Sequence, residues 1–73
     1  MVVYESDLKK MAISAMENCM AYITAGYMKK AHEYYGTARA YEDMLFDEGI
    51  DLEAENEHYR EMRDIYFEKG AKQ

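Results

Sequence analysis

The residues best spaced for chemistry are a carboxylate and an imidazole in the C-terminal third of the chain. Glu55 and His58 form a single Glu-x-x-His pattern, the spacing with which ferritin-like bundles hold a pair of metal ions. Residues three apart share one face of a helix, so the carboxylate can bridge two metals while the imidazole binds one of them. Chance readily produces one such pattern in a glutamate-rich segment. We therefore predict no metal or other cofactor, and keep a metal-binding helical bundle centred on Glu55 and His58 as an alternative.

Templates for catalysis are missing from the sequence. It contains no Gly-rich phosphate loop, no Cys/His cluster and no plausible Ser-His-Asp set. Of the two serines, Ser6 suits a helix N-cap and Ser14 falls inside the helix that follows. Cys19 is the only cysteine, which excludes a disulfide within the chain, and its neighbours Asn18 and Met20 offer no positive charge to activate the thiol. We expect no enzymatic activity and no catalytic residue.

The charge of the chain is concentrated in its C-terminal half. The net charge is −6, of which residues 1–40 contribute +1 and residues 41–73 contribute −7. Between Glu42 and Glu57 there are eight acidic residues and no basic one. Direct binding of DNA or RNA needs clustered positive charge, so it is not expected.

The acidic stretch 42–57 has two interpretations. Charge runs usually form solvated faces, and acids at the start of a helix stabilise its dipole. The functional alternative is an anionic surface that mimics a nucleic-acid backbone and inhibits a nucleic-acid-handling protein, as accessory or mobile-element proteins do. The candidate surface consists of Asp43, Asp47, Glu48, Asp51 and Glu53.

Apolar residues recur at steps of three and four, which is the period of a helix and not of a strand. The chain has no proline, and we predict an all-α fold whose first helix begins near Ser6. The apolar seam consists of Leu8, Ala12, Met16, Met20, Ile23, Tyr27, Ala31, Tyr34, Ala38, Tyr41 and Leu45.

A turn is expected near residue 49, and it predicts an antiparallel helical hairpin of residues 27–48 with 51–69. Gly49 can adopt the left-handed conformation that ends a helix, and Asp51 can cap the next one. Pairing across this turn places Ala38 opposite Tyr59 and Ala31 opposite Tyr66, so that small residues face large ones. The tyrosine hydroxyls would reach the rim or a polar partner such as Glu55.

The N-terminal segment, residues 6–24, has two possible arrangements. The chain either breaks near Thr24–Gly26 and folds back as a three-helix bundle, or continues as one helix of about 60 Å. The second helix of the hairpin is too short to cover this segment in an extended molecule. We therefore predict a homo-oligomer, with a dimer expected first. The proposed oligomer seam consists of Leu8, Met16, Met20, Ile23 and Tyr27.

Taken together, the sequence predicts a single helical domain over residues 1–73 that does not catalyse a reaction. Eight tyrosines and seven methionines favour protein recognition, because both residue types are over-represented at interfaces. We expect self-association and binding to an unidentified protein, which would carry a basic surface if the acidic stretch recognises it. Neither a signal peptide nor a stretch apolar enough to span a membrane is recognisable, so a cytoplasmic location and no membrane binding are expected.

Overall fold

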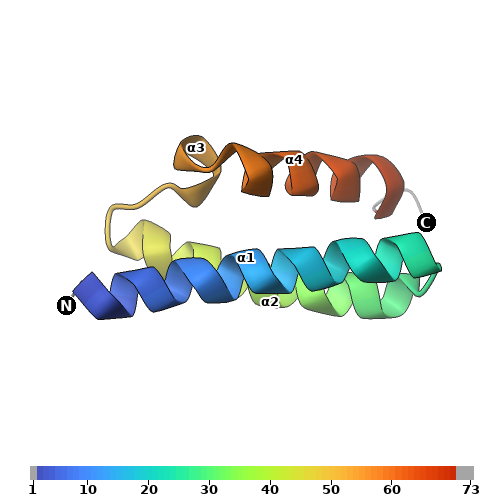
Figure 1. Cartoon of the computed structure of the whole chain (residues 1–73), viewed down its shortest axis with the longest axis horizontal. Coiled ribbons are helices and arrows are strands. Elements are labelled where there is room, and N and C mark those ends of the chain that lie inside the picture. Colours follow the sequence, from blue (N-terminus) through green and yellow to red (C-terminus); the bar gives the residue numbers. More distant parts are fainter. Residues whose placement is uncertain (1, 71–73) are drawn as a thin grey trace.

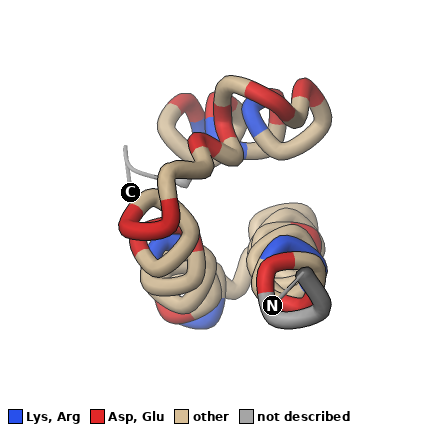
Figure 2. Tube along the Cα trace, turned by 90° about the vertical axis from the view of Figure 1, so that its left-hand side faces the viewer, with Lys and Arg blue, Asp and Glu red and all other residues tan. Residues whose placement is uncertain are grey.

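The computed structural model describes residues 2–70 and contains only helices and turns within them (Figure 1). Two long helices, α1 (Val2–Ala25) and α2 (Met28–Asp47), form an antiparallel hairpin. The rest of the chain runs back along this hairpin as α3 (Leu52–Glu55), α4 (Glu57–Ile65) and a π-helical turn, η1 (Tyr66–Gly70). Viewed along the long axis, the three rods lie at the corners of a triangle (Figure 2). The predicted all-α class is confirmed.

The chain folds back at Gly26, which resolves the question of the N-terminal segment in favour of three helical rods. Gly26 has φ +85°, a left-handed conformation that costs other residues energy. Its N–H donates to the carbonyl of Ile23 at 3.1 Å, and the N–H of Tyr27 donates to that of Tyr22 at 2.9 Å. This pair of bonds is the Schellman motif, which ends a helix and reverses the chain.

Gly49 repeats the same arrangement at the end of α2, as the sequence predicts. Its φ is +85°, and its N–H donates to the carbonyl of Phe46 at 2.9 Å. Asp51 then caps α3, because its Oδ1 accepts a hydrogen bond from the N–H of Ala54 at 3.2 Å. The glycine and the aspartate together convert the acidic segment into a sharp turn.

The expectation of one uninterrupted helix over 51–69 is wrong at Asn56. This residue is extended, with φ −126° and ψ 103°, and it ends α3 after a single turn. Its side-chain Oδ1 accepts a hydrogen bond from the N–H of Tyr59 at 2.9 Å and thereby begins α4. Asparagine is among the preferred N-caps, so the interruption has a local cause.

The last segment reaches α2 through its tyrosines. The ring of Tyr66 stacks on that of Tyr35 with centroids 3.8 Å apart, and the hydroxyl of Tyr59 donates to Glu42 at 2.9 Å. These contacts lie about one helical turn from the predicted pairings with Ala31 and Ala38. Residues 27–48 and 51–69 are thus in contact, whereas the hairpin that the structure forms is the pairing of α1 with α2.

One core joins all three rods. It corrects the expectation that the apolar residues of the N-terminal segment 6–24 are not covered within the chain. Leu8 and Met16 are buried in this core, because the turn at Gly26 lays α1 directly on α2. Met20 and Ile23 are half-buried, and Tyr27 at the turn is 64% exposed. The buried residues are Leu8, Ala12, Ala15, Met16, Cys19, Ala31, Ala38, Leu45, Leu52, Tyr59, Met62 and Tyr66.

None of the helices within residues 2–70 combines the length and the apolar character that crossing a bilayer requires.

Gly26 at the turn and Gly36 inside α2 together give a test of this fold. Replacing Gly26 with alanine should destabilise the protein by about 1 kcal/mol or more, because alanine is strained at positive φ. Replacing Gly36 with alanine is the matched control, since Gly36 lies inside α2 and an added Cβ meets no atom within 4 Å. It should stabilise the protein by about 0.5–1 kcal/mol. Urea denaturation followed by circular dichroism measures both; a neutral Gly26→Ala would contradict the turn.

Candidate functional site

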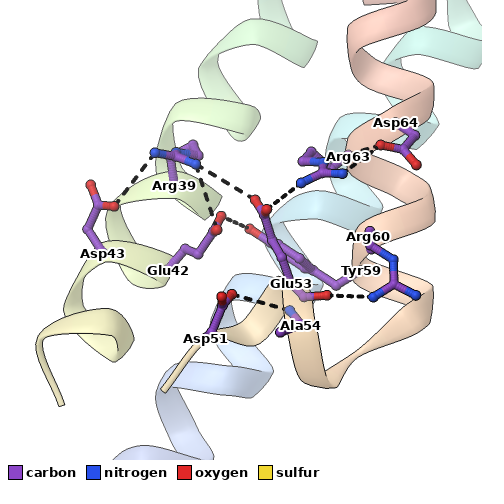
Figure 3. Close-up of polar contacts among 10 residues, drawn as sticks. All are labelled: Arg39, Glu42, Asp43, Asp51, Glu53, Ala54, Tyr59, Arg60, Arg63 and Asp64. Carbon is purple, nitrogen blue, oxygen red and sulfur yellow. Dashed lines mark hydrogen bonds and ion pairs between the residues drawn. The ribbon is translucent and has the colours of Figure 1, made fainter. Parts of the chain in front are cut away.

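Glu53 is held inside an ion network instead of standing on a free acidic surface. Its carboxylate accepts a hydrogen bond from the guanidinium of Arg63, and Arg39 Nη1 lies 3.7 Å from its Oε2. The Glu53 side chain is only 19% exposed. It thus connects α3 to α2 and α4 (Figure 3). Glu53 thus differs from the other predicted members of the partner-binding surface, because its carboxylate is engaged within the protein.

Glu42 lies beside Glu53 in the same network. Its Oε1 accepts the Tyr59 hydroxyl, and its Oε2 lies 3.7 Å from Arg39 Nη1. The pKa of Glu42 is raised from 4.5 to about 7, chiefly by burial and then by the neighbouring Glu53, against the opposing effects of Tyr59 and Arg39. Burial, followed by the charge of Glu42, likewise raises the pKa of Tyr59, so its hydroxyl remains a donor.

The two carboxyl groups meet at Arg39, because Oε2 of each lies 3.7 Å from Arg39 Nη1. Glu53 Oε2 is buried and accepts no hydrogen bond from another residue, a costly condition for an acceptor. We predict that a protonated Glu42 carboxyl donates to this oxygen and so strengthens the attachment of α3 and α4 to α2.

A depression of about 320 Å³ lies next to these carboxyl groups, with Phe46 and Ile50 also at its wall. A raised carboxyl pKa beside a depression is one sign of a catalytic acid, but structural ion networks produce the same shift. Here Tyr59, Arg39 and Arg63 all engage the pair from the protein side. Burial and the neighbouring Glu53 raise the pKa of Glu42 in spite of the contacts with Tyr59 and Arg39, so no substrate is needed to explain it.

A larger open feature than this depression is a groove between α1 and α4, referred to below as the α1–α4 groove. It measures about 740 Å³, and its apolar lining joins Met20 and Ile23 of α1 to Met62 and Ile65 of α4. The remaining lining residues are Glu17, Thr24, His58 and Lys69. Two members of the predicted oligomer seam, Met20 and Ile23, therefore belong to an accessible surface, whereas Leu8 and Met16 do not.

The candidate metal ligands do not converge. Glu55 Oε1 lies 2.7 Å from the ammonium of Lys9, and His58 Nε2 lies 3.5 Å from Glu17 Oε2. The extended residue Asn56 separates Glu55 from His58, so they do not share a helical face. In the part of the chain that the structure describes, no group of three or more His, Cys, Asp or Glu side chains could hold a metal ion.

The other four acidic candidates gather around the turn between α2 and α3. Asp43, Asp47, Glu48 and Asp51 are all exposed. Asp43 lies 3.8 Å from Arg39, and Asp51 also caps α3. Phe46 projects among them with 67% of its surface exposed. The turn is thus an acidic surface with one large aromatic residue.

Cys19 contributes no reactive group, in agreement with the sequence analysis. The side chain is fully buried in the core, and burial raises the pKa of its thiol to about 11. A thiol in this state has little thiolate character at neutral pH.

The sequence analysis did not predict Glu42 as the partner of the Tyr59 hydroxyl and expected Glu55 as the polar partner of the tyrosines. The usable signal was the predicted pairing itself. It placed Tyr59 opposite Ala38, and Glu42 is one turn further along α2 and can therefore meet the hydroxyl.

No protein-family model matches the chain, and the searches of curated proteins and of solved structures found no match either.

The Glu42–Glu53 pair predicts a specific dependence of stability on pH. The pKa of Glu42 is about 7 in the folded protein and near 4.5 when unfolded, so over this interval the folded state holds a proton that the unfolded chain releases. The stabilisation is full below the unfolded value and is lost as the pH rises through the folded one. The urea midpoint should therefore fall between about pH 5 and pH 8.

In the Glu42→Gln variant the urea midpoint should change less between about pH 5 and pH 8, and near pH 8 the variant should be more stable than the wild type. Its amide can accept from Tyr59 and donate to Glu53 at any pH. Asp43→Asn is the matched control, because Asp43 is the exposed neighbour on the same helix, and it should keep the wild-type slope. Equal slopes in the wild type and Glu42→Gln would show that the pair does not share a proton.

Proposed function

We propose that this chain is a non-catalytic, acidic helical interaction protein that self-associates and binds another protein. The observation that carries the proposal is the α1–α4 groove, where Met20, Ile23 and Ile65 present apolar surface to water beside the nearly buried Met62. Contiguous exposed apolar surface is unfavourable in an isolated protein and commonly marks an interaction site.

The shape and composition of the groove favour a helical or extended protein segment as its ligand. Two helices lying side by side leave a channel that an amphipathic segment can fill with side chains at helical spacing. The two methionines are flexible and polarisable, so they adapt to different apolar side chains. The polar groups Glu17, His58 and Lys69 also line the groove, and an interface rim typically has this polar character.

A second candidate is the inhibitor that acts through the acidic turn. It is favoured by the exposed Phe46 lying among Asp43, Asp47, Glu48 and Asp51. Carboxylates can steer a basic partner toward the surface, and an exposed aromatic ring can add contact area after docking. Such a partner would be a protein whose own nucleic-acid site carries the basic groups.

Site-specific crosslinking tests the role of the groove. A photo-crosslinking amino acid in place of Ile65, which is 42% exposed in the groove, should capture a protein in the native cell. The same amino acid in place of Met11 is the control, because Met11 is 45% exposed but outside the groove. Mass spectrometry then identifies the captured chain. Equal capture at both positions, or none at residue 65, would contradict the proposal.

Charge reversal tests the acidic turn separately. The double variant Asp47→Lys/Glu48→Lys should no longer capture those partners whose binding to the wild type weakens as the salt concentration rises. Such salt dependence is expected of partners bound by exposed charges, because salt screens these charges. Glu53 is left intact so that the fold is retained. Glu57→Lys/Glu61→Lys is the matched control, with two exposed acids reversed on α4. If pull-downs with the Asp47/Glu48 variant recover the same proteins at the same yield, the inhibitor hypothesis fails.

A further inference from the structure

We propose that the α1–α4 groove docks on the same groove of a second copy, as an antiparallel twofold dimer in which Glu17 of each copy lies opposite Lys69 of the other. The inference rests on the proposed role of the groove as a docking surface and names its occupant.

The groove has two different ends. α1 and α4 run in the same direction along the molecule (Figure 1), so their residues advance together along the channel. Glu17 and His58 line the end where both helices enter, with 3.5 Å between His58 Nε2 and Glu17 Oε2. Thr24 and Lys69 line the opposite end. The groove is therefore acidic at one end and basic at the other.

This polarity selects the orientation of a second copy. A parallel arrangement would place Glu17 against Glu17 and Lys69 against Lys69, and like charges held together oppose association. A twofold axis through the middle of the groove reverses one copy, so each carboxylate meets an ammonium. Twofold dimers of this kind use one self-complementary patch on both subunits.

The apolar residues lie between the charged ends, where the twofold axis would pass. Met62 forms part of the floor and is nearly buried, whereas Ile65 stands on the wall with 42% of its surface exposed. In the dimer, Ile65 of each copy would enter the other groove near Met20. Flexible methionine side chains can adjust to this contact without a change in the backbone.

The size of the patch sets the expected affinity. Four apolar side chains and one charged pair from each copy are fewer than a stable obligate interface uses. Loss of the dimer would not unfold the subunit, because the core is complete within one chain. We therefore expect a reversible dimer in the micromolar range, which analytical ultracentrifugation of the full chain can measure.

A charge swap provides the decisive experiment. Glu17→Lys turns both intersubunit pairs into cation–cation contacts, and Lys69→Glu turns both into anion–anion contacts. Each variant alone should dimerise roughly tenfold more weakly than the wild type. A mixture of the two variants pairs opposite charges twice and should form heterodimers at close to the wild-type affinity. Parallel docking, or docking through another face, would not give this recovery.

Two controls keep the result interpretable. Asp47→Lys and Lys29→Glu reverse exposed charges outside the groove with the same changes in net charge, and their mixture should show no such preference for the heterodimer. Ile65→Asp should weaken dimerisation by at least about tenfold, whereas Met11→Asp should not. Circular dichroism confirms that each variant is folded.

Two results would overturn the inference: a strict monomer at millimolar concentration, or a mixture of the Glu17 and Lys69 variants no tighter than either alone. A strict monomer would also remove self-association from the proposed function, but neither result would refute the binding of another protein through the groove. That proposal fails independently, if the crosslinker at residue 65 captures no more protein than the one at residue 11. Capture of a different protein together with a strict monomer would keep the groove as a docking surface and reject the second copy as its occupant.

Discussion

The fold depends on large side chains that pack on the hairpin of α1 and α2, because the hairpin itself buries mainly small residues. Ala12 and Ala15 of α1 and Ala31 and Ala38 of α2 are buried, but alanine offers only one methyl group, and burial stabilises by about 0.8 kcal/mol per methylene-sized group. The hairpin alone therefore removes little apolar surface from water along this part of its length. The large buried side chains of the C-terminal segment supply the missing volume, and they are Leu52, Tyr59, Met62 and Tyr66.

The electrostatic network follows from the choice of tyrosine for two of these large residues. A buried tyrosine hydroxyl needs a partner, and both hydroxyls find one on α2. Tyr59 donates to Glu42, and the Tyr66 hydroxyl lies 2.7 Å from Nδ1 of His32. The packing that buries Tyr59 also removes water from Glu42, which raises the pKa of this carboxyl group and makes nearby arginines favourable. Phenylalanine at position 59 would fill the same space without needing a carboxyl group beside it.

The sequence was sufficient for the helical class, the turn at Gly49–Asp51, the break near Gly26 as one of two options, and the opposition of small and large residues. These features are local, or repeat at a period that can be read directly. The sequence was insufficient to predict that Leu8 and Met16 are buried within one chain. Helix lengths in an extended molecule do not show that α1 packs on α2. The helix break at Asn56 was not predicted, because in sequence an asparagine that caps a helix looks the same as one in the middle of a helix. The roles of Glu42 and Glu53 depend on three elements meeting, which no single spacing encodes.

The α1–α4 groove arises because the side chains of the last segment fill the space toward α2 but not the space toward α1. Toward α2, two tyrosine rings occupy the space, and hydrogen bonds hold their ends. Toward α1, Met62 is the buried residue of α4 that lines the groove, and Met20 and Ile23 remain partly open. A larger side chain at residue 65 could close the channel at little cost to the core, because Ile65 is already 42% exposed. Stability of the single subunit therefore does not require an open groove. An apolar surface that folding leaves exposed is more economically explained by binding than by the demands of the core.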